Sequence, residues 1–218
     1  SIPSVEITSL GASLLADCTN VESITVPFVG ASKDSDTDLK YIFGDVAPEA
    51  LTSVKILSGK IEDGDFKNLG SIEKIEITDE VASAGISKDA FGGCVSLQYN
   101  EYKNGLYLGS KKNKHIALIE AKNTDIESCK IAKGTKIICQ SAFEGCDKIE
   151  EIKLGKNVER IETGAFMGCK NLQSVYIPRG VKVIEEDAYN GCIRLTIKCE
   201  SEEPPREDGN SWSQDWNP

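Results

Sequence analysis

The stretch AFMGCKNL, at residues 165–172, occurs three times in nearly the same form. AFEGCDKI at 142–149 precedes it and AYNGCIRL at 188–195 follows it, and the two intervals between these copies are equal. Alignment on these copies gives a unit L-x-x-V-x-I-(P)-x-G-V-x-x-I-x-x-x-A-F-x-G-C-x-x, which is clearest over 126–148, 149–171 and 172–194. Recurrence at a fixed period of this length predicts a solenoid, because one short unit buries its apolar face only against its neighbours.

The repeat extends over most of the chain but is interrupted in its first half. Each unit opens with a leucine-like residue, and these are Val21, Leu51, Ile72, Leu97, Ile126, Ile149, Leu172 and Leu195. The spacing of these residues is constant from Ile126 onward and irregular before it. We therefore predict a solenoid of about eight repeats over residues 1–199, with insertions at 30–44 and 104–121, and a C-terminal cap or tail at 200–218.

Each unit predicts a short strand followed by a turn. In LQSVYIP (172–178), Val175 and Ile177 are separated by one residue, which is the period of a half-buried strand. Pro178 ends that strand because it has no N–H to donate to a neighbouring strand. The segment EEDAYNGC (185–192) then reads as a helical or 3-10 turn that returns apolar side chains to the core. The fold class is therefore a repeat solenoid, α/β but leaning to β.

The composition excludes two classes of function. A formal net charge of −10 argues against nucleic-acid binding, since that affinity rests on clustered lysine and arginine. No apolar run approaches the roughly 18 residues that a membrane-spanning helix requires, so we expect no membrane insertion. The chain begins at Ser1 rather than Met, and we expect a processed fragment whose targeting segment has been removed.

Eight cysteines in 218 residues raise the question of disulfides or a metal site. There is no CxxC pair and only one histidine, His115, so a zinc site is not indicated. Four cysteines share one position of the repeat, which predicts buried thiols stacked from coil to coil: Cys94, Cys146, Cys169 and Cys192. Parallel Cβ directions on adjacent coils disfavour disulfides among them. Cys129 takes a core strand position. Cys139 aligns with Glu162 and Glu185 of the next two units and is expected to be exposed, and with Cys199 it is the best candidate for a reactive thiol.

The first insertion contains an acidic motif. Asp34, Asp36 and Asp38 give D-x-D-x-D, which opens a calcium-binding loop. The continuation fails, because the sixth position is Leu39 rather than Gly and the twelfth is Asp45 rather than Glu. A solvated acidic loop is therefore the interpretation, with calcium as its alternative. The second insertion, NGLYLGSKKNKHIALIEA (104–121), predicts a hairpin with a polar GSKKNK turn and an exposed His115.

Units of the form LQSVYIPRGVKVIEEDAYNGC (172–192) resemble the BspA-type leucine-rich repeats of bacterial and protist surface proteins. YIFG (41–44), the 104–121 insertion and the ending from Cys199 with its tryptophans resemble segments that accompany this repeat type. This sequence departs from the repeat pattern of that family at two places. Residues 45–48 lack the phenylalanine and cysteine of the unit, and Leu69 replaces the cysteine. The resemblance implies a right-handed coil with a curved parallel sheet and short helical turns on its other side. It also implies an extracellular or surface-anchored protein associated with adhesion or host interaction.

The candidate contact residues follow from the strand pattern, in which the centre of V-x-I points outward. These positions are Thr25, Lys55, Glu76, Glu101, Lys130, Lys153 and Tyr176. Lys130, Lys153 and Tyr176 stand one repeat apart and are predicted neighbours. Trp212 and Trp216, four positions apart in the tail, are either part of a cap or an aromatic ligand platform. Such rows suit protein or glycan surfaces, of a host or its matrix, better than small molecules, which need concave pockets.

Enzymatic activity is not predicted. The chain has no glycine-rich phosphate loop, no G-x-S-x-G and no cluster of metal ligands, so catalytic residues, cofactor and metal are all assigned as none. The favoured function is a non-catalytic binding or adhesion module. Its alternative is a structural spacer that displays another part of a longer surface protein.

Overall fold

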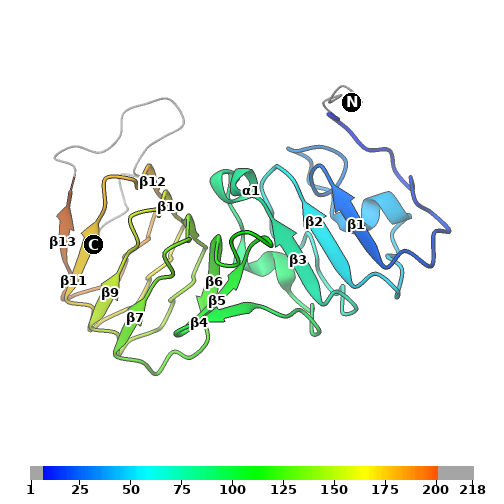
Figure 1. The fold of residues 1–218 in the computed structure, drawn as a ribbon. Coiled ribbons are helices and arrows are strands. Elements are labelled where there is room, and N and C mark those ends of the chain that lie inside the picture. Colours follow the sequence, from blue (N-terminus) through cyan, green and yellow to red (C-terminus); the bar gives the residue numbers. More distant parts are fainter. Residues whose placement is uncertain (1–6, 201–218) are drawn as a thin grey trace. The chain divides into compact units, whose positions relative to one another are not determined.

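The structure, a computed structural model, describes residues 7–200 and divides into two compact units between Gln98 and Tyr99. Both units are built mainly from short parallel strands contributed by successive coils (Figure 1). This confirms the predicted repeat solenoid with parallel sheets and little helix. The cap expected at 200–218 lies outside the described residues apart from Glu200.

The N-terminal unit contains a three-stranded parallel sheet in the order β1-β2-β3. Its strands are β1 (Ser23–Val26), β2 (Ser53–Ile56) and β3 (Lys74–Ile77). A parallel bridge between Ile61 and Ile86 begins a second row of pairing. Its helices are the 3-10 helices η1 (Leu39–Phe43) and η2 (Lys88–Phe91) and the α-helix α1 (Asp79–Ala84).

The C-terminal unit contains two sheets. One has four parallel strands in the order β13-β11-β9-β7, which are β7 (Ser128–Lys130), β9 (Glu151–Lys153), β11 (Ser174–Ile177) and β13 (Thr196–Cys199). The other has six strands in the order β12-β10-β8-β6-β5-β4. Its members are β4 (Asn100–Tyr102), β5 (Gly105–Leu108), β6 (Ala117–Ala121), β8 (Ile137–Ile138), β10 (Arg160–Ile161) and β12 (Val183–Ile184).

The predicted hairpin is confirmed and has an added strand. β5 pairs antiparallel with β6 across the 109–116 turn, as the two apolar runs indicated. β4 adds a third antiparallel strand on the other side of β5. β6 then pairs parallel with β8, so the insertion extends the second sheet of the repeats. His115 is half-buried rather than exposed, because its ring packs 5.0 Å from the ring of Tyr107 and 5.7 Å from that of Tyr102.

Between the sheets lies a ladder of aromatic rings and thiols. In the C-terminal unit, Phe143 and Phe166 stack at 5.3 Å and Phe166 and Tyr189 at 5.0 Å between ring centroids. The repeat cysteines lie beside them, with the Cys192 thiol donating to the Phe166 carbonyl at 3.2 Å. In the N-terminal unit, Phe66 and Phe91 stack at 5.7 Å. The predicted coil-to-coil stack of repeat thiols is therefore confirmed in the C-terminal unit, and the aromatic rings of the same motif stack beside it.

The A-F-x-G-C segments of the C-terminal unit form the predicted turns, closed by hydrogen bonds between residues three apart, and do not continue into helices. Every second backbone N–H of the segment bonds to the next coil instead of to its own turn. The Phe166 N–H donates to the Ala188 carbonyl, and the Gly168 N–H donates to the Asn190 carbonyl. A helix would need those donors for its own turns. The glycine of the motif takes φ values of 71, 75 and 77° at Gly145, Gly168 and Gly191, which explains the requirement for glycine.

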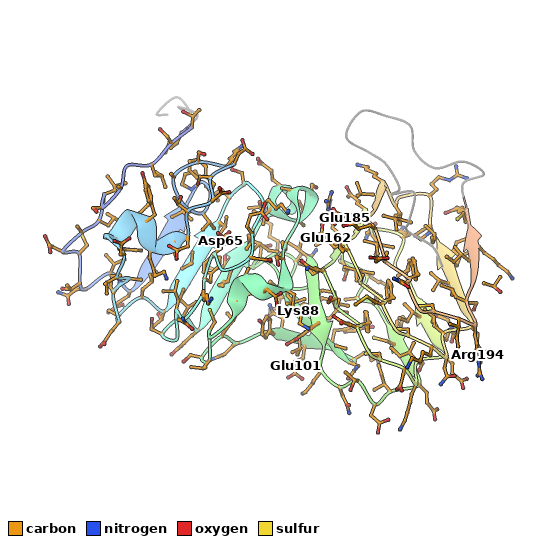
Figure 2. All side chains as sticks on the ribbon, turned by 180° about the vertical axis from the view of Figure 1, so that it is seen from behind. Asp65, Lys88, Glu101, Glu162, Glu185 and Arg194 are labelled. Carbon is orange, nitrogen blue, oxygen red and sulfur yellow. The ribbon has the colours of Figure 1, made fainter. Side chains whose placement is uncertain are left out.

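Asp65 is a polar exception in this core. It occupies the alanine position of the A-F motif and is 7% exposed (Figure 2). Burial raises the pKa of its carboxyl to about 7, although the Glu62 N–H donates to it at 2.8 Å. The nearby carboxylates of Glu62, Asp38 and Asp63 raise that pKa further.

We expect Asp65→Asn to stabilise the protein above neutral pH. The folded state holds a proton that the unfolded state loses near pH 4, so the free energy of unfolding falls as the pH rises from about 4 to about 7. The asparagine keeps an acceptor without the charge, and should raise that free energy by roughly 1–3 kcal/mol at pH 8 and little at pH 4. Urea unfolding of both proteins at the two pH values measures this, with exposed Asp34→Asn as control. An equal effect at both pH values would contradict the assignment.

Candidate functional site

The outward side of the sheet β7-β9-β11-β13 carries the predicted contact row. Lys130 pairs in register with Lys153, and Tyr176 pairs with Lys198. The register between β9 and β11, Ser174 with Glu151 and Val175 with Ile152, continues the row from Lys153 to Tyr176. These four residues, Lys130, Lys153, Tyr176 and Lys198, are called the strand face below.

Strand alternation exposes these side chains. Within β7, β9 and β11 the central residue is buried and its two neighbours are exposed, which turns Lys130, Lys153 and Tyr176 to solvent. Tyr176 is 54% exposed. The Lys153 ammonium lies 3.1 Å from a Glu151 carboxylate oxygen. Lys130 and Lys198 make no ion pair with any residue of 7–200 and so present uncompensated charge.

Lys198 was missed by the sequence analysis. In every earlier unit the outward residue lies four positions after the opening leucine-like residue, as Tyr176 does after Leu172. Lys198 lies only three positions after Leu195, because the last unit is one residue shorter at this point. The pairing of Val175 with Ile197 restores the register and reveals Lys198 as the fourth member. The signal in the sequence was Ile197, an apolar residue that matches the buried Val175 and so makes the next residue, Lys198, an outward position.

The other predicted positions are arranged differently. In the N-terminal unit, Thr25, Lys55 and Glu76 form a separate row in register. Glu76 is only 9% exposed and forms an ion pair with Lys74, so its prediction as an open contact residue is wrong. Glu101 also leaves the predicted row, because it lies on β4, where it pairs with Leu106 and forms an ion pair with Lys122. Trp212 and Trp216 lie outside the described residues.

A second polar group crosses the coils on the six-stranded sheet. The Arg160 guanidinium donates to the carboxylates of Glu162 and Glu185, which Figure 2 shows near one another. The Thr163 hydroxyl donates to Glu185 at 2.9 Å. Burial lowers the pKa of Arg160, but the two carboxylates outweigh it and raise that pKa. Glu162 is 3% exposed, so these acids form a structural network rather than an open catalytic pair.

The thiols differ from the prediction at one position. Cys139 is fully buried, and burial raises its pKa well above the ordinary value, so its predicted reactivity is wrong. The misleading signal was its alignment with Glu162 and Glu185, which looked like an exposed position. Cys199 is exposed, although partial burial of its thiol raises the pKa of that group. All eight cysteines, Cys18 included, are free thiols.

The acidic motif of the first insertion serves the local fold. Asp38 caps η1 by accepting from the Lys40 N–H at 2.9 Å, and its carboxylate also lies 3.0 Å from the Lys40 ammonium. Asp34 and Asp36 are exposed. Across residues 7–200 no three histidine, cysteine, aspartate or glutamate side chains are arranged to hold a metal ion. Over the same range, no helix has the length and apolarity to cross a membrane.

Known structures include several chains similar to this one. They include a leucine-rich-repeat protein of T. pallidum at 23% identity, covering 82% of this chain and 71% of that one with a TM-score of 0.31. A leucine-rich cell surface protein of Faecalibacterium prausnitzii is 18% identical, covering 90% of this chain and 77% of that one with a TM-score of 0.37. A leucine-rich-repeat protein of Bacteroides ovatus is 27% identical, covering 84% and 45%, with a TM-score of 0.38. No curated protein matches the chain.

The repeats themselves match a known family. The family described as "BspA type Leucine rich repeat region" matches residues 121–201 in six copies. That range begins at the end of β6 and covers every A-F-x-G-C segment of the C-terminal unit. The chain therefore carries a BspA-type leucine-rich-repeat region.

Proposed function

We propose that this chain is a non-catalytic binding module, extracellular or on the cell surface, whose strand face contacts a protein or glycan of a host or its matrix. The observation that carries the proposal is the in-register row of Lys130, Lys153, Tyr176 and Lys198. The repeat type of residues 121–201 supports the surface location and an adhesive role.

The chemistry of the strand face suits an extended partner. Tyr176 offers a half-exposed ring with a hydroxyl, and tyrosine is among the residues that contribute most to binding interfaces. The charges of Lys130 and Lys198 are not consumed by ion pairs within residues 7–200. Alternation keeps all of these side chains out of the core, so they contribute to contact without contributing to the fold.

The buried acids support a non-catalytic role. A carboxylate pair acting in general acid–base catalysis must reach a substrate in a cleft. Glu162 instead lies in the core beside Arg160, and Glu159 accepts from Lys136 at 2.9 Å and from Lys182 at 3.3 Å. Glu162 thus binds a cation of its own coil, and Glu159 binds cations of the two neighbouring coils.

We expect binding of the full chain to an array of extracellular-matrix proteins and glycans at physiological salt. The variant Lys130→Glu, Lys153→Glu, Tyr176→Ala should bind the ligand found on the array at least about tenfold more weakly, since it reverses two charges and removes the ring. The matched control is Lys170→Glu, an exposed lysine on a turn rather than on a strand of that sheet. A hit that the triple variant retains would move the site elsewhere, and no hit would favour the spacer function.

A further inference from the structure

One corner of the C-terminal unit stacks four turns on one another. The side-chain amide of Asn113, in the loop between β5 and β6, donates to the Gly134 carbonyl at 2.7 Å. The side-chain amide of Asn157 donates to the Lys133 carbonyl at 2.7 Å. The inserted loop therefore lies on the 133–134 turn, which lies on the 156–157 turn. The loop thus continues the stack of the regular repeats.

Glycine at this corner permits close approach. A Cβ on Gly134 would lie 2.3 Å from the Asn113 Oδ1 atom. A Cβ on Gly180 would lie 2.9 Å from the Lys156 carbonyl oxygen, which places the 179–180 turn directly on the 156–157 turn. Both distances are too short for a side chain, so glycine fixes how closely these turns stack.

Every turn of this stack carries exposed cations. The inserted loop contributes Lys111, Lys112 and Lys114, and the three repeat turns contribute Lys133, Lys156 and Arg179. These six residues are called the basic column. The five lysines form no ion pair within residues 7–200, whereas Arg179 lies 3.8 Å from a Glu200 carboxylate oxygen. A chain of net charge −10 thus concentrates positive charge along one edge of this unit.

Acidic neighbours do not cancel this charge. Glu159, three positions after Lys156, accepts from both Lys136 and Lys182. Burial raises the pKa of Glu159, but these two ammonium groups outweigh it and hold that pKa below its ordinary value. Glu159 is therefore held by these two lysines rather than by a cation of the basic column.

We propose that the basic column binds an anionic polysaccharide that carries one acid group on each sugar, aligned with the direction in which the coils stack. Adjacent parallel strands are about 4.8 Å apart, so successive turns present one cation per coil at about that interval. A pyranose unit of an extended polysaccharide advances by a similar distance, so an acid on each sugar supplies about as many charges per unit length as the column supplies cations. This site is separate from the strand face and does not rest on the function proposed for it.

Other polyanions fit this geometry less well. An extended peptide advances by about 3.3 Å per residue, so a polyacidic segment carries its charges more densely than the coils carry cations. Nucleic acid has a denser charge still, about one per 1.7 Å of duplex, so only a fraction of its phosphates would meet a cation of the column. The coil interval therefore favours the glycan.

The test is a titration of the full chain with an oligogalacturonate long enough to span the four turns. We expect saturable binding that weakens with added salt, and no binding of the same oligosaccharide with its carboxylates methyl-esterified. The variant Lys114→Gln, Lys133→Gln, Lys156→Gln should weaken binding by at least about tenfold. The variant Lys103→Gln, Lys170→Gln, Arg194→Gln removes the same charge from exposed residues outside both the basic column and the strand face, and should stay within about twofold of wild type.

Three results would overturn the proposal. Equal binding of the esterified oligosaccharide would show that charge is not recognised. Equal weakening in the two variants, or none in either, would show that the basic column is not the site. Binding of poly-L-glutamate at least as tight as the oligogalacturonate would assign the column to an acidic polypeptide. The array experiment tests the strand face separately. A ligand found there that only the strand-face variant fails to bind would support the proposed function, whatever the result of this titration.

Discussion

Phe166→Ala is expected to lower the free energy of unfolding of the protein by about 3–5 kcal/mol. Phe166 is fully buried and stacks on both sides, 5.3 Å from the Phe143 ring and 5.0 Å from the Tyr189 ring. Removing the middle ring leaves a cavity between two coils, and neither outer ring can close it without leaving its own coil. Urea unfolding followed by circular dichroism measures the loss.

The control for this prediction is Tyr176→Ala, an aromatic deletion on the outside of the next coil. Tyr176 is 54% exposed, so its loss should change the same free energy by no more than about 0.5 kcal/mol. Similar losses in the two variants would mean that the stacked rings are not the centre of the core.

Arg160→Leu is expected to cost about 3–5 kcal/mol, although it adds an apolar side chain. The reason is Glu162, which is 3% exposed and accepts from the Arg160 guanidinium. Without that cation the buried Glu162 carboxylate loses the guanidinium that offsets its charge, and Glu185 loses the same donor.

The double variant Arg160→Leu, Glu162→Leu separates charge from packing. It removes both members of the buried pair, so it should recover most of the loss caused by Arg160→Leu alone. The measurement is the same urea unfolding, with the two single variants completing the cycle. A double variant that is no more stable than Arg160→Leu would contradict the assigned role of Glu162.

The strands were predicted well because, in the regular repeats, the apolar residues that recur at matching positions are the ones buried in the core. Val175 and Ile177 recur at matching positions, and the structure pairs Val175 with Ile152 on one side and Ile197 on the other. The stack of Phe166 and Tyr189 followed from the same period. Where the repeat is regular, one unit determines its neighbours.

The sequence predicted less where one coil departs from the next. Cys139 looked exposed because its counterparts in later units are glutamates, yet Glu162 is itself buried through its pair with Arg160. The repeat period alone cannot show that a charged residue is buried with a partner. Glu101 left the strand row because the insertion pairs β4 antiparallel with β5, a change of sheet that spacing does not record.

The basic column escaped sequence analysis for a related reason. Lys133, Lys156 and Arg179 recur at a fixed interval, which the sequence does show. The loop lysines become part of the series only through the hydrogen bond from Asn113 to Gly134, between residues 21 positions apart. A polar loop and a repeat turn thus form one surface that neither segment reveals by itself.

The most direct test of the binding function compares three full-length proteins against the strongest array hit. These are wild type, the strand-face variant Lys130→Glu, Lys153→Glu, Tyr176→Ala, and the basic-column variant Lys114→Gln, Lys133→Gln, Lys156→Gln. Equilibrium titration should show the strand-face variant weakened by at least about tenfold and the basic-column variant within about twofold of wild type. Wild-type affinity in the strand-face variant would contradict the account.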